Sequence, residues 1–149
     1  MKKFSLIILV IIIIVVVWML YPTEKRKMKS DIMQLKKAVE NENVENIIEY
    51  IDPQYRDASG MTYDEIKELI LEFLAQVDSI KIQMSGMKLN IDSTGRGDVV
   101  FASCSLGLRV LARYEGERVL AFGGIVHPGS VRGFFRKAGH TYRLYYAEY

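Results

Sequence analysis

Few side chains in this sequence have the type and spacing that chemistry requires. Its two histidines are His127, in a glycine-rich stretch, and His140, in a turn close to the C-terminus. Neither has a cysteine or a second histidine at metal-ligand spacing, so we expect no metal site. Cys104 is the single cysteine and cannot form an internal disulfide. His127 is a candidate general acid or base with no supporting neighbour.

Two further short motifs are considered for chemistry. Tyr55-Arg56-Asp57 places a base beside an acid, which is more typical of a local ion pair or turn than of catalysis. Gly123-Gly124 could expose backbone amides to an anion, yet it lacks the rest of a phosphate-binding loop. We therefore expect no catalytic residue and no cofactor.

The first residues favour a membrane anchor. From Phe4 to Tyr21 every residue except Ser5 is apolar or aromatic. At about 1.5 Å per residue this run crosses most of a ~30 Å hydrocarbon core. No small residues of a cleavage site follow, so an uncleaved anchor over 1–22 is favoured over a cleaved signal. Trp18 and Tyr21 suit the headgroup level, and Pro22 is expected to end the span.

The orientation of that anchor is nearly balanced. Lys2 and Lys3 precede the span, and a larger basic group follows it in a predicted juxtamembrane linker, residues 23–30: Lys25, Arg26, Lys27 and Lys29. The larger number of Lys and Arg residues after the span places the domain in the cytoplasm by the positive-inside rule. In contrast, a short basic head before a long apolar run is typical of a signal-anchor, which leaves the domain on the far side of the membrane. We expect a single-pass protein of a bacterial inner membrane with an extracytoplasmic C-terminal domain. Membrane lipid is then a partner of the N-terminal helix.

Residues 31–149 have the length of one domain with its own core. The net charge of +2 and the pI of about 8.6 are too mild to indicate a nucleic-acid partner. Apolar residues at helical spacing predict two helices joined near Asn43, which is a suitable N-cap, with Pro53 closing the second: Met28, Ile32, Leu35 and Val39, then Val44, Ile47, Ile48 and Ile51.

A third helix is predicted after a capping box of Thr62 and Glu65. It should pack across a sheet through one apolar stripe: Ile66, Leu69, Ile70, Phe73, Leu74 and Val77.

From Ser79 onward the apolar period becomes two, which predicts strands, with a bulge or bend at Gly86 and a turn over residues 93–98. The next long strand has an inward row: Val100, Ala102, Cys104, Leu106, Leu108, Val110 and Ala112. The chain ends in a hairpin around Ala138-Gly139-His140. Helices followed by an antiparallel sheet indicate an α+β fold.

This order of elements resembles the nuclear transport factor 2-like superfamily over Asp31 to Tyr149. The closing hairpin carries the most specific part of the resemblance: Gly139, Tyr142, Arg143 and Leu144. The resemblance implies a cone of three helices on a curved antiparallel sheet, with a pocket at one end. Its enzymes use a pocket aspartate with tyrosine or histidine partners. The inward row here has no carboxylate, which lowers the expectation of an enzyme.

Two residue groups are candidates for binding. Aromatic residues that could line the open end of the cone, or simply belong to its core and rim, are Tyr50, Tyr55, Phe135, Tyr142 and Tyr146. Residues that strand alternation places on the outer face, as an interface or a solvated face, are Arg109, Arg113, Arg132, Phe134, Arg136, Arg143 and Tyr145.

These observations favour a membrane-tethered, non-catalytic module that binds a partner protein or a small apolar ligand. The outer sheet face would then serve a homodimer or a membrane-protein partner. The first alternative is an isomerase- or dehydratase-type enzyme that uses the aromatic residues of the cone pocket together with Asp57 or His127. The second is a passive accessory subunit of an inner-membrane complex.

Overall fold

The computed structural model describes residues 2–20, 23–92 and 99–149, with side chains in the first helix described for residues 8–17. The elements follow in this order: α1 (Lys2–Leu20), α2 (Glu24–Glu40), α3 (Val44–Glu49), β1 (Ile51–Asp57), α4 (Tyr63–Gln76), β2 (Val77–Asp92), β3 (Phe101–Tyr114), β4 (Glu117–Phe122), β5 (Gly129–Ala138) and β6 (Thr141–Glu148). The predicted α+β class is confirmed.

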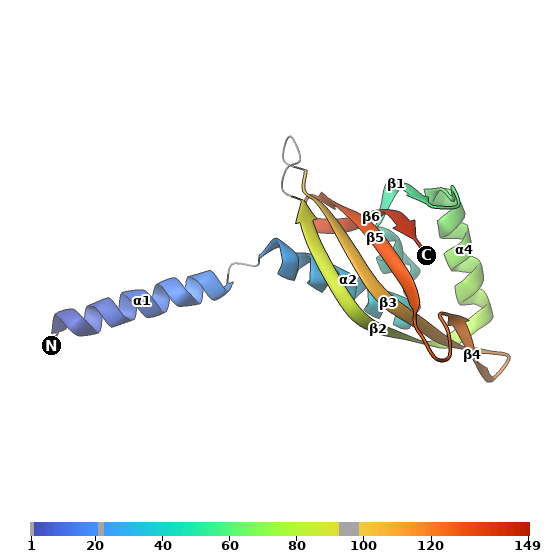
Figure 1. Cartoon of the computed structure of the whole chain (residues 1–149), viewed down its shortest axis with the longest axis horizontal. Helices are drawn as coiled ribbons and strands as arrows, with labels where there is room; N and C mark the ends of the chain where they lie inside the picture. Colours follow the sequence, from blue (N-terminus) through green and yellow to red (C-terminus); the bar gives the residue numbers. More distant parts are fainter. Residues whose placement is uncertain (1, 21–22, 93–98) are drawn as a thin grey trace.

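Helix α1 projects away from the remaining elements (Figure 1). Within the described part of the chain, no helix has both the length and the apolar character required to cross a membrane. The predicted end of the span, at Tyr21 and Pro22, lies outside the described residues, as does the predicted turn over 93–98.

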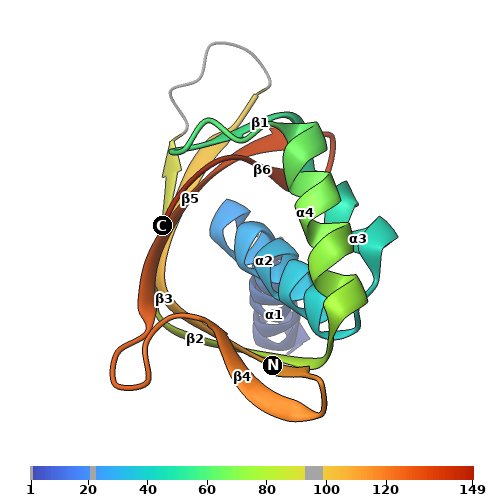
Figure 2. The same ribbon diagram turned by 90° about the vertical axis from the view of Figure 1, so that its right-hand side faces the viewer.

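The sheet curves around α2, with α3 and α4 on the same side (Figure 2). Its strand order is β1-β6-β5-β3-β2, and β4 pairs with β3. The prediction of a purely antiparallel sheet is wrong, because β1 pairs with β6 in parallel. Pro53 does not close a helix but lies in β1, where an edge strand tolerates a residue without an amide donor.

Helix α2 begins earlier than its apolar spacing suggests. The Thr23 hydroxyl caps it by accepting from the Arg26 amide at 3.4 Å. The helix thus starts inside the stretch 23–30 that the sequence predicted as a linker. Met28, in the second turn, is fully buried in the core.

The predicted caps of the other two domain helices are confirmed. Asn43 Oδ1 accepts from the Asn46 amide at 3.1 Å at the start of α3. At the start of α4 the Glu65 carboxylate accepts from the Thr62 amide at 2.7 Å and from its hydroxyl at 2.8 Å. These bonds satisfy amides that the first helical turn leaves without partners.

The strands follow the predicted register. Gly86 has a φ of +61°, and the pairing of β2 with β3 shifts between Ser85 and Lys88, which confirms the bulge. On β3, Ala102, Cys104 and Ala112 are buried, as the inward row predicts. The sheet therefore presents an apolar concave face to the helices.

Two buried clusters make up the core. One joins α2 to β3, β5 and β6 around Met28 and Tyr142, and the other joins α2, α3, β1 and β6 around Ile47 and Tyr55. Leu144 packs against both clusters. In α4, no described residue is fully buried, and Leu69 is 47% exposed. Helix α4 is thus the most loosely packed cover of the concave face.

Candidate functional site

A cavity of about 470 Å³ lies between α2, α4 and the concave face of the sheet. This volume is within the ~300–1,000 Å³ that small-molecule sites occupy. The apolar residues that line it include Ile32 and Leu35 of α2, Ile66 and Ile70 of α4, and Leu106 and Leu108 of β3. Such a lining favours an apolar ligand because binding removes apolar surface from water on both sides.

Three of the lining residues carry a polar group, and these are Lys36, Tyr55 and Cys104. Burial raises the pKa of the Cys104 thiol to about 11, so the reactive thiolate is scarce at neutral pH. Burial also raises the pKa of Tyr55, whose side chain is almost fully buried. Among the described residues, none forms a hydrogen bond with the Tyr55 hydroxyl.

Lys36 is held in place by Glu40, one helical turn later. Its Nζ donates to Glu40 Oε2 at 3.0 Å, and Glu40 Oε1 accepts from the Ile82 amide at 2.8 Å. Burial opposes ionisation of Glu40, but the Ile82 amide and the Lys36 ammonium outweigh it and keep the pKa of Glu40 below its ordinary value. This pair ties α2 to β2 beside the cavity.

The structure separates the five aromatic residues predicted to line a pocket. Tyr55 and Phe135 line the cavity. Tyr50 lies at a different hollow, and Tyr146 stacks at a tilt on Phe134, with ring centroids 5.6 Å apart. Tyr142 is fully buried beside α2.

Tyr142 belongs to a polar cluster that the sequence analysis did not find. Its hydroxyl donates to Glu24 at 2.5 Å, and Lys137 Nζ donates to the same carboxylate at 2.7 Å. The Tyr142 amide donates to buried Asp31 at 2.9 Å, and Lys27 pairs with that carboxylate. Lys137 and Tyr142 keep the pKa of Glu24 low, whereas burial and Glu24 raise that of Tyr142. The cluster fastens α2 to the final hairpin.

Asp57 and His127, the residues considered for catalysis, lie elsewhere. Asp57 Oδ1 accepts from the Ser59 amide and hydroxyl, each at 2.9 Å, and from the Met61 amide at 2.8 Å. Its Oδ2 accepts from the Tyr149 hydroxyl at 2.6 Å. His127 is exposed in the loop between β4 and β5. Neither residue lines the cavity.

The predicted outer-face residues divide into two groups. On β3, Arg109 donates to the carbonyls of Gly124 and Ile125, each at 3.0 Å, and Arg113 lies 4.0 Å from Asp78. These contacts hold the β4–β5 loop and a strand edge.

The second outer-face group lies on β5 and β6. Arg132 lies over the Phe134 ring at 5.2 Å, and the Tyr145 ring meets Phe101 edge-on at 5.9 Å. Arg136 donates to both carboxylate oxygens of buried Asp52, at 2.7 and 3.0 Å. In contrast, the buried Nε of Arg143 has no hydrogen-bond partner among the described residues.

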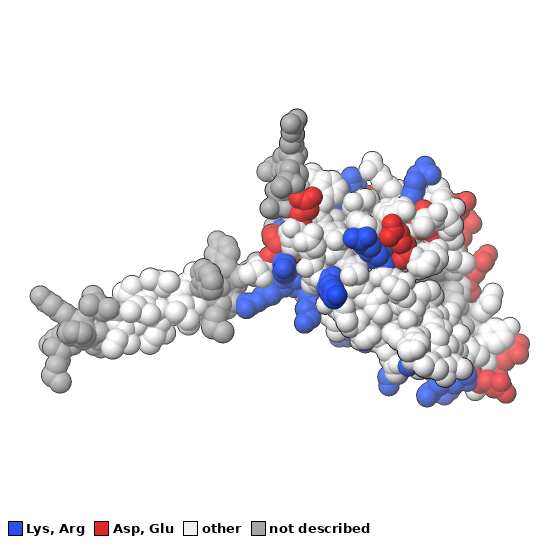
Figure 3. All heavy atoms as spheres, viewed as in Figure 1, with Lys and Arg blue, Asp and Glu red and all other residues white. Residues whose placement is uncertain are grey.

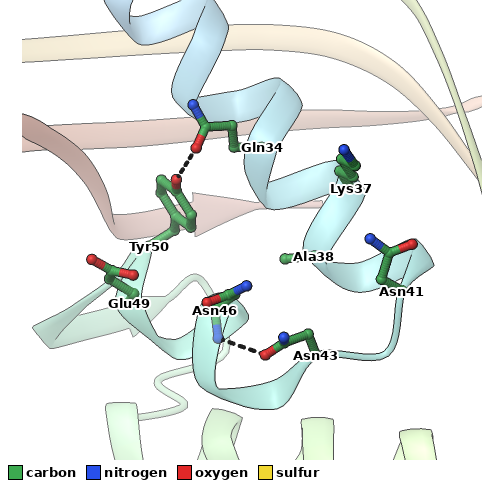
Figure 4. Close-up of a pocket in the computed structure, with 8 residues that line it drawn as sticks. All are labelled: Gln34, Lys37, Ala38, Asn41, Asn43, Asn46, Glu49 and Tyr50. Atoms are coloured by element: carbon green, nitrogen blue, oxygen red, sulfur yellow. Dashed lines mark hydrogen bonds between the residues drawn. The ribbon is translucent and has the colours of Figure 1, made fainter.

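A second hollow lies between the C-terminal end of α2 and α3, and it is polar (Figure 4). The Tyr50 hydroxyl donates to Gln34 at 2.8 Å across it, and Lys37 stands at its edge.

Lysine and arginine side chains gather where α1 meets the domain (Figure 3). Lys36 and Lys37 are neighbours in sequence, but Lys36 lines the apolar cavity and Lys37 borders the polar hollow.

Comparison with protein families finds no match, and no curated protein sequence matches the chain. Solved structures do match. The helical cell shape determining protein Pgp2 of Campylobacter jejuni superposes with a TM-score of 0.65 at 11% identity over 85% of this chain. The match covers 41% of the Pgp2 chain, so this chain spans less than half of that length.

Two Novosphingobium aromaticivorans structures match over most of both chains. A proposed aromatic ring hydroxylase has a TM-score of 0.61 at 12% identity, covering 80% of this chain and 82% of its own. A proposed scytalone dehydratase has a TM-score of 0.59 at 12% identity, covering 84% and 81%. At such identities the likeness concerns the fold. The chain shares its fold with these structures, and an α+β domain with a strongly curved sheet is what the resemblance to the nuclear transport factor 2-like superfamily implies.

Proposed function

We propose that this chain is a non-catalytic binding module, held at a membrane by its N-terminal segment, whose cone cavity takes a small apolar ligand. The observation that carries the ligand proposal is the cavity of about 470 Å³ with its apolar lining. The tether is supported by the sequence of residues 4–21, apolar or aromatic at every position except Ser5. Confinement to a surface raises the effective concentration of a module toward membrane components.

Binding without catalysis is supported by the positions and pKa values of the candidate proton-transfer groups. An isomerase or dehydratase requires a proton-transfer group poised near neutral pH at its reacting centre. The carboxylate of Asp57 is occupied by turn and tyrosine hydrogen bonds, and His127 lies on an exposed loop. The pKa values of Tyr55 and Cys104 are both raised away from neutrality. None of these groups is placed for acid–base work on a cavity ligand.

The proposal is tested with a neutral, environment-sensitive dye such as N-phenyl-1-naphthylamine. The full chain is reconstituted in phosphatidylcholine nanodiscs, and empty nanodiscs give the background. Cys104→Phe places a ring inside the cavity, and Ser103→Phe places the same ring on the other face of β3 as a matched control. We expect saturable binding that Cys104→Phe abolishes and Ser103→Phe retains. Equal binding to both variants, or none to the parent chain, would exclude the cavity site.

A second role, as an interface between two copies or with a membrane protein, is supported by the outer face of β5 and β6. Arg132 is exposed there over the Phe134 ring, at 5.2 Å from its centroid, and arginine and aromatic side chains are enriched at protein interfaces. We expect the full chain to sediment as a dimer and Arg132→Met to shift it toward the monomer. Sedimentation of the parent chain as a monomer at every concentration would exclude self-association.

A further inference from the structure

The polar groups beside the cavity narrow the class of ligand. Among the described residues that line the cavity, Lys36 alone carries a charge, and its side chain is 23% exposed. It therefore lies where the apolar interior meets water. A long side chain in this position buries its stem and presents its ammonium group.

Hydrogen-bonding capacity is left on this ammonium. A lysine ammonium has three N–H donors. Among the described residues, Lys36 donates one hydrogen bond, to Glu40, so the other donors remain for a ligand. Glu40 does not compete freely for those donors, because its Oε1 is fixed by the Ile82 amide at 2.8 Å. An incoming anion can therefore share Lys36 without breaking the contact of Glu40 with β2.

The charge balance beside Glu40 is positive. Lys81, exposed on β2 next to Ile82, also acts on the Glu40 carboxylate through its charge. Two ammonium groups therefore act on one carboxylate beside the cavity, and Lys36 is the nearer of the two, because it hydrogen-bonds to Glu40 and lines the cavity. A ligand with a negative end is stabilised there, whereas a cationic end meets repulsion.

We propose that the ligand is a single-chain amphiphile whose apolar chain occupies the cavity and whose anionic head group accepts a hydrogen bond from Lys36. This inference rests on the proposed function, since it concerns the same cavity. The apolar lining accounts for the chain, and Lys36 accounts for the head group. A fatty acid and a lysophospholipid share this chemistry, so they are separate arms of the test.

The test uses three probes with the same chain, namely decanoate, decanol and decylammonium, titrated into the full chain in nanodiscs by calorimetry. We expect decanoate to bind about tenfold more tightly than decanol, as one partly exposed charge-assisted hydrogen bond allows. Decylammonium should bind most weakly. Palmitate and lysophosphatidylglycerol then compete with decanoate, and the stronger competitor identifies the source of the head group.

Three variants assign the effect to Lys36. Lys36→Met should reduce decanoate to the affinity of decanol, whereas Lys37→Met, on the same helix but bordering the other hollow, should leave both unchanged. Glu40→Gln should strengthen decanoate binding, because it removes the competing charge while keeping an acceptor for the Ile82 amide. This gain does not depend on whether Lys36→Met folds well.

Two negative results have different meanings. Equal affinities for decanoate and decanol, both abolished by Cys104→Phe, would overturn the head-group inference and leave the proposed apolar site standing. No binding of any probe, or binding that Cys104→Phe does not change, would overturn the head-group inference and the proposed function together.

Discussion

Two buried aspartates of β1, Asp52 and Asp57, are stabilised in different ways. Asp52 is 1% exposed and is paired with the Arg136 guanidinium, which also donates to Gln54 at 3.0 Å. Asp57 is 4% exposed, and the described residues that donate to it do so through amides and hydroxyls, without a cation. The first aspartate therefore depends on one distant side chain, and the second on its own turn and the C-terminal tyrosine.

Removal of Arg136 leaves the Asp52 carboxylate buried without its counter-charge. We expect Arg136→Met to lower the free energy of unfolding by about 2–4 kcal/mol, slightly less than for a fully buried pair because the arginine side chain is 31% exposed. Urea denaturation measures this change. Arg132→Met, which removes an exposed cation over Phe134, is the control and should cost about 1 kcal/mol or less. Equal losses in the two variants would contradict the assignment.

The pair of Asp57 and Tyr149 makes stability depend on pH at both extremes. The Tyr149 hydroxyl, followed by the turn hydrogen bonds, lowers the pKa of Asp57, and the same contact raises that of Tyr149. Because folding lowers the pKa of Asp57, its ionised carboxylate stabilises the fold at pH values above the unfolded-state pKa of ~3.9. This stabilisation is lost as the pH falls through the folded-state pKa. Because folding raises the pKa of Tyr149, its protonated hydroxyl stabilises the fold at pH values below the unfolded-state pKa of ~10. This stabilisation is lost as the pH rises through the folded-state pKa of the tyrosine.

Tyr149→Phe tests this coupling. We expect the pKa of Asp57, followed by carboxyl carbon NMR, to rise in the variant because its shortest donor is gone. The alkaline loss of stability in thermal unfolding should also shrink. Ser59→Ala, which removes a weaker donor, is the matched comparison and should give a smaller rise. An unchanged Asp57 titration in Tyr149→Phe would show that the hydrogen bond contributes nothing.

At the scale of elements, helix caps and strand alternation were predictable, whereas β1 was not. Asn43, Thr62 and the inward row of β3 are local signals, read within a few residues. β1 buries Asp52 and Asp57 and carries Pro53, so it lacks the apolar alternation that marks a strand. Asp52 is tolerated inside because distant Arg136 reaches it, and Asp57 because its own turn and distant Tyr149 donate to it. The parallel pairing with β6 was missed for the same reason.

The bend of β2 depends on the backbone of Gly86. Its φ of +61° is in the left-handed region, and a Cβ there would meet no atom within 4 Å. Gly86→Ala should therefore lower the free energy of unfolding by about 1–2 kcal/mol through backbone strain alone. Gly86→Asn should cost less, because asparagine visits this region more readily. Urea denaturation compares the two, and a larger loss for asparagine would point to steric contact instead.

At the scale of the whole molecule, part of the candidate site was predictable. Tyr55 and Phe135 were expected at a pocket and line the cavity. Tyr142 was expected there too, but Glu24 and Asp31 hold it beside α2, more than a hundred residues earlier in the chain. Such contacts have no local sequence signal. The place of Lys36 at the cavity was equally hidden, because it depends on how α2 and β2 meet in space.

The tether is a prediction about the whole molecule. The full chain should remain in the membrane pellet after alkaline carbonate extraction, because residues 4–21 transfer a long apolar run into lipid. A chain that begins at Thr23 keeps the N-cap of α2 and should be released. A reporter fused after Tyr149 then gives the side of the membrane, which we expect to be extracytoplasmic. Release of the full chain by carbonate would contradict the tether.

The cavity between α2, α4 and the sheet is where we propose that an apolar ligand binds. The most direct measurement is the anomalous scattering of bromine in crystals of the full chain grown with bromodecanoate brominated at its terminal carbon. We predict a bromine peak inside the cavity, among Cys104, Leu106 and Ile70. A peak only on the outer face of the sheet or along α1, with the cavity free of ligand, would contradict the claim.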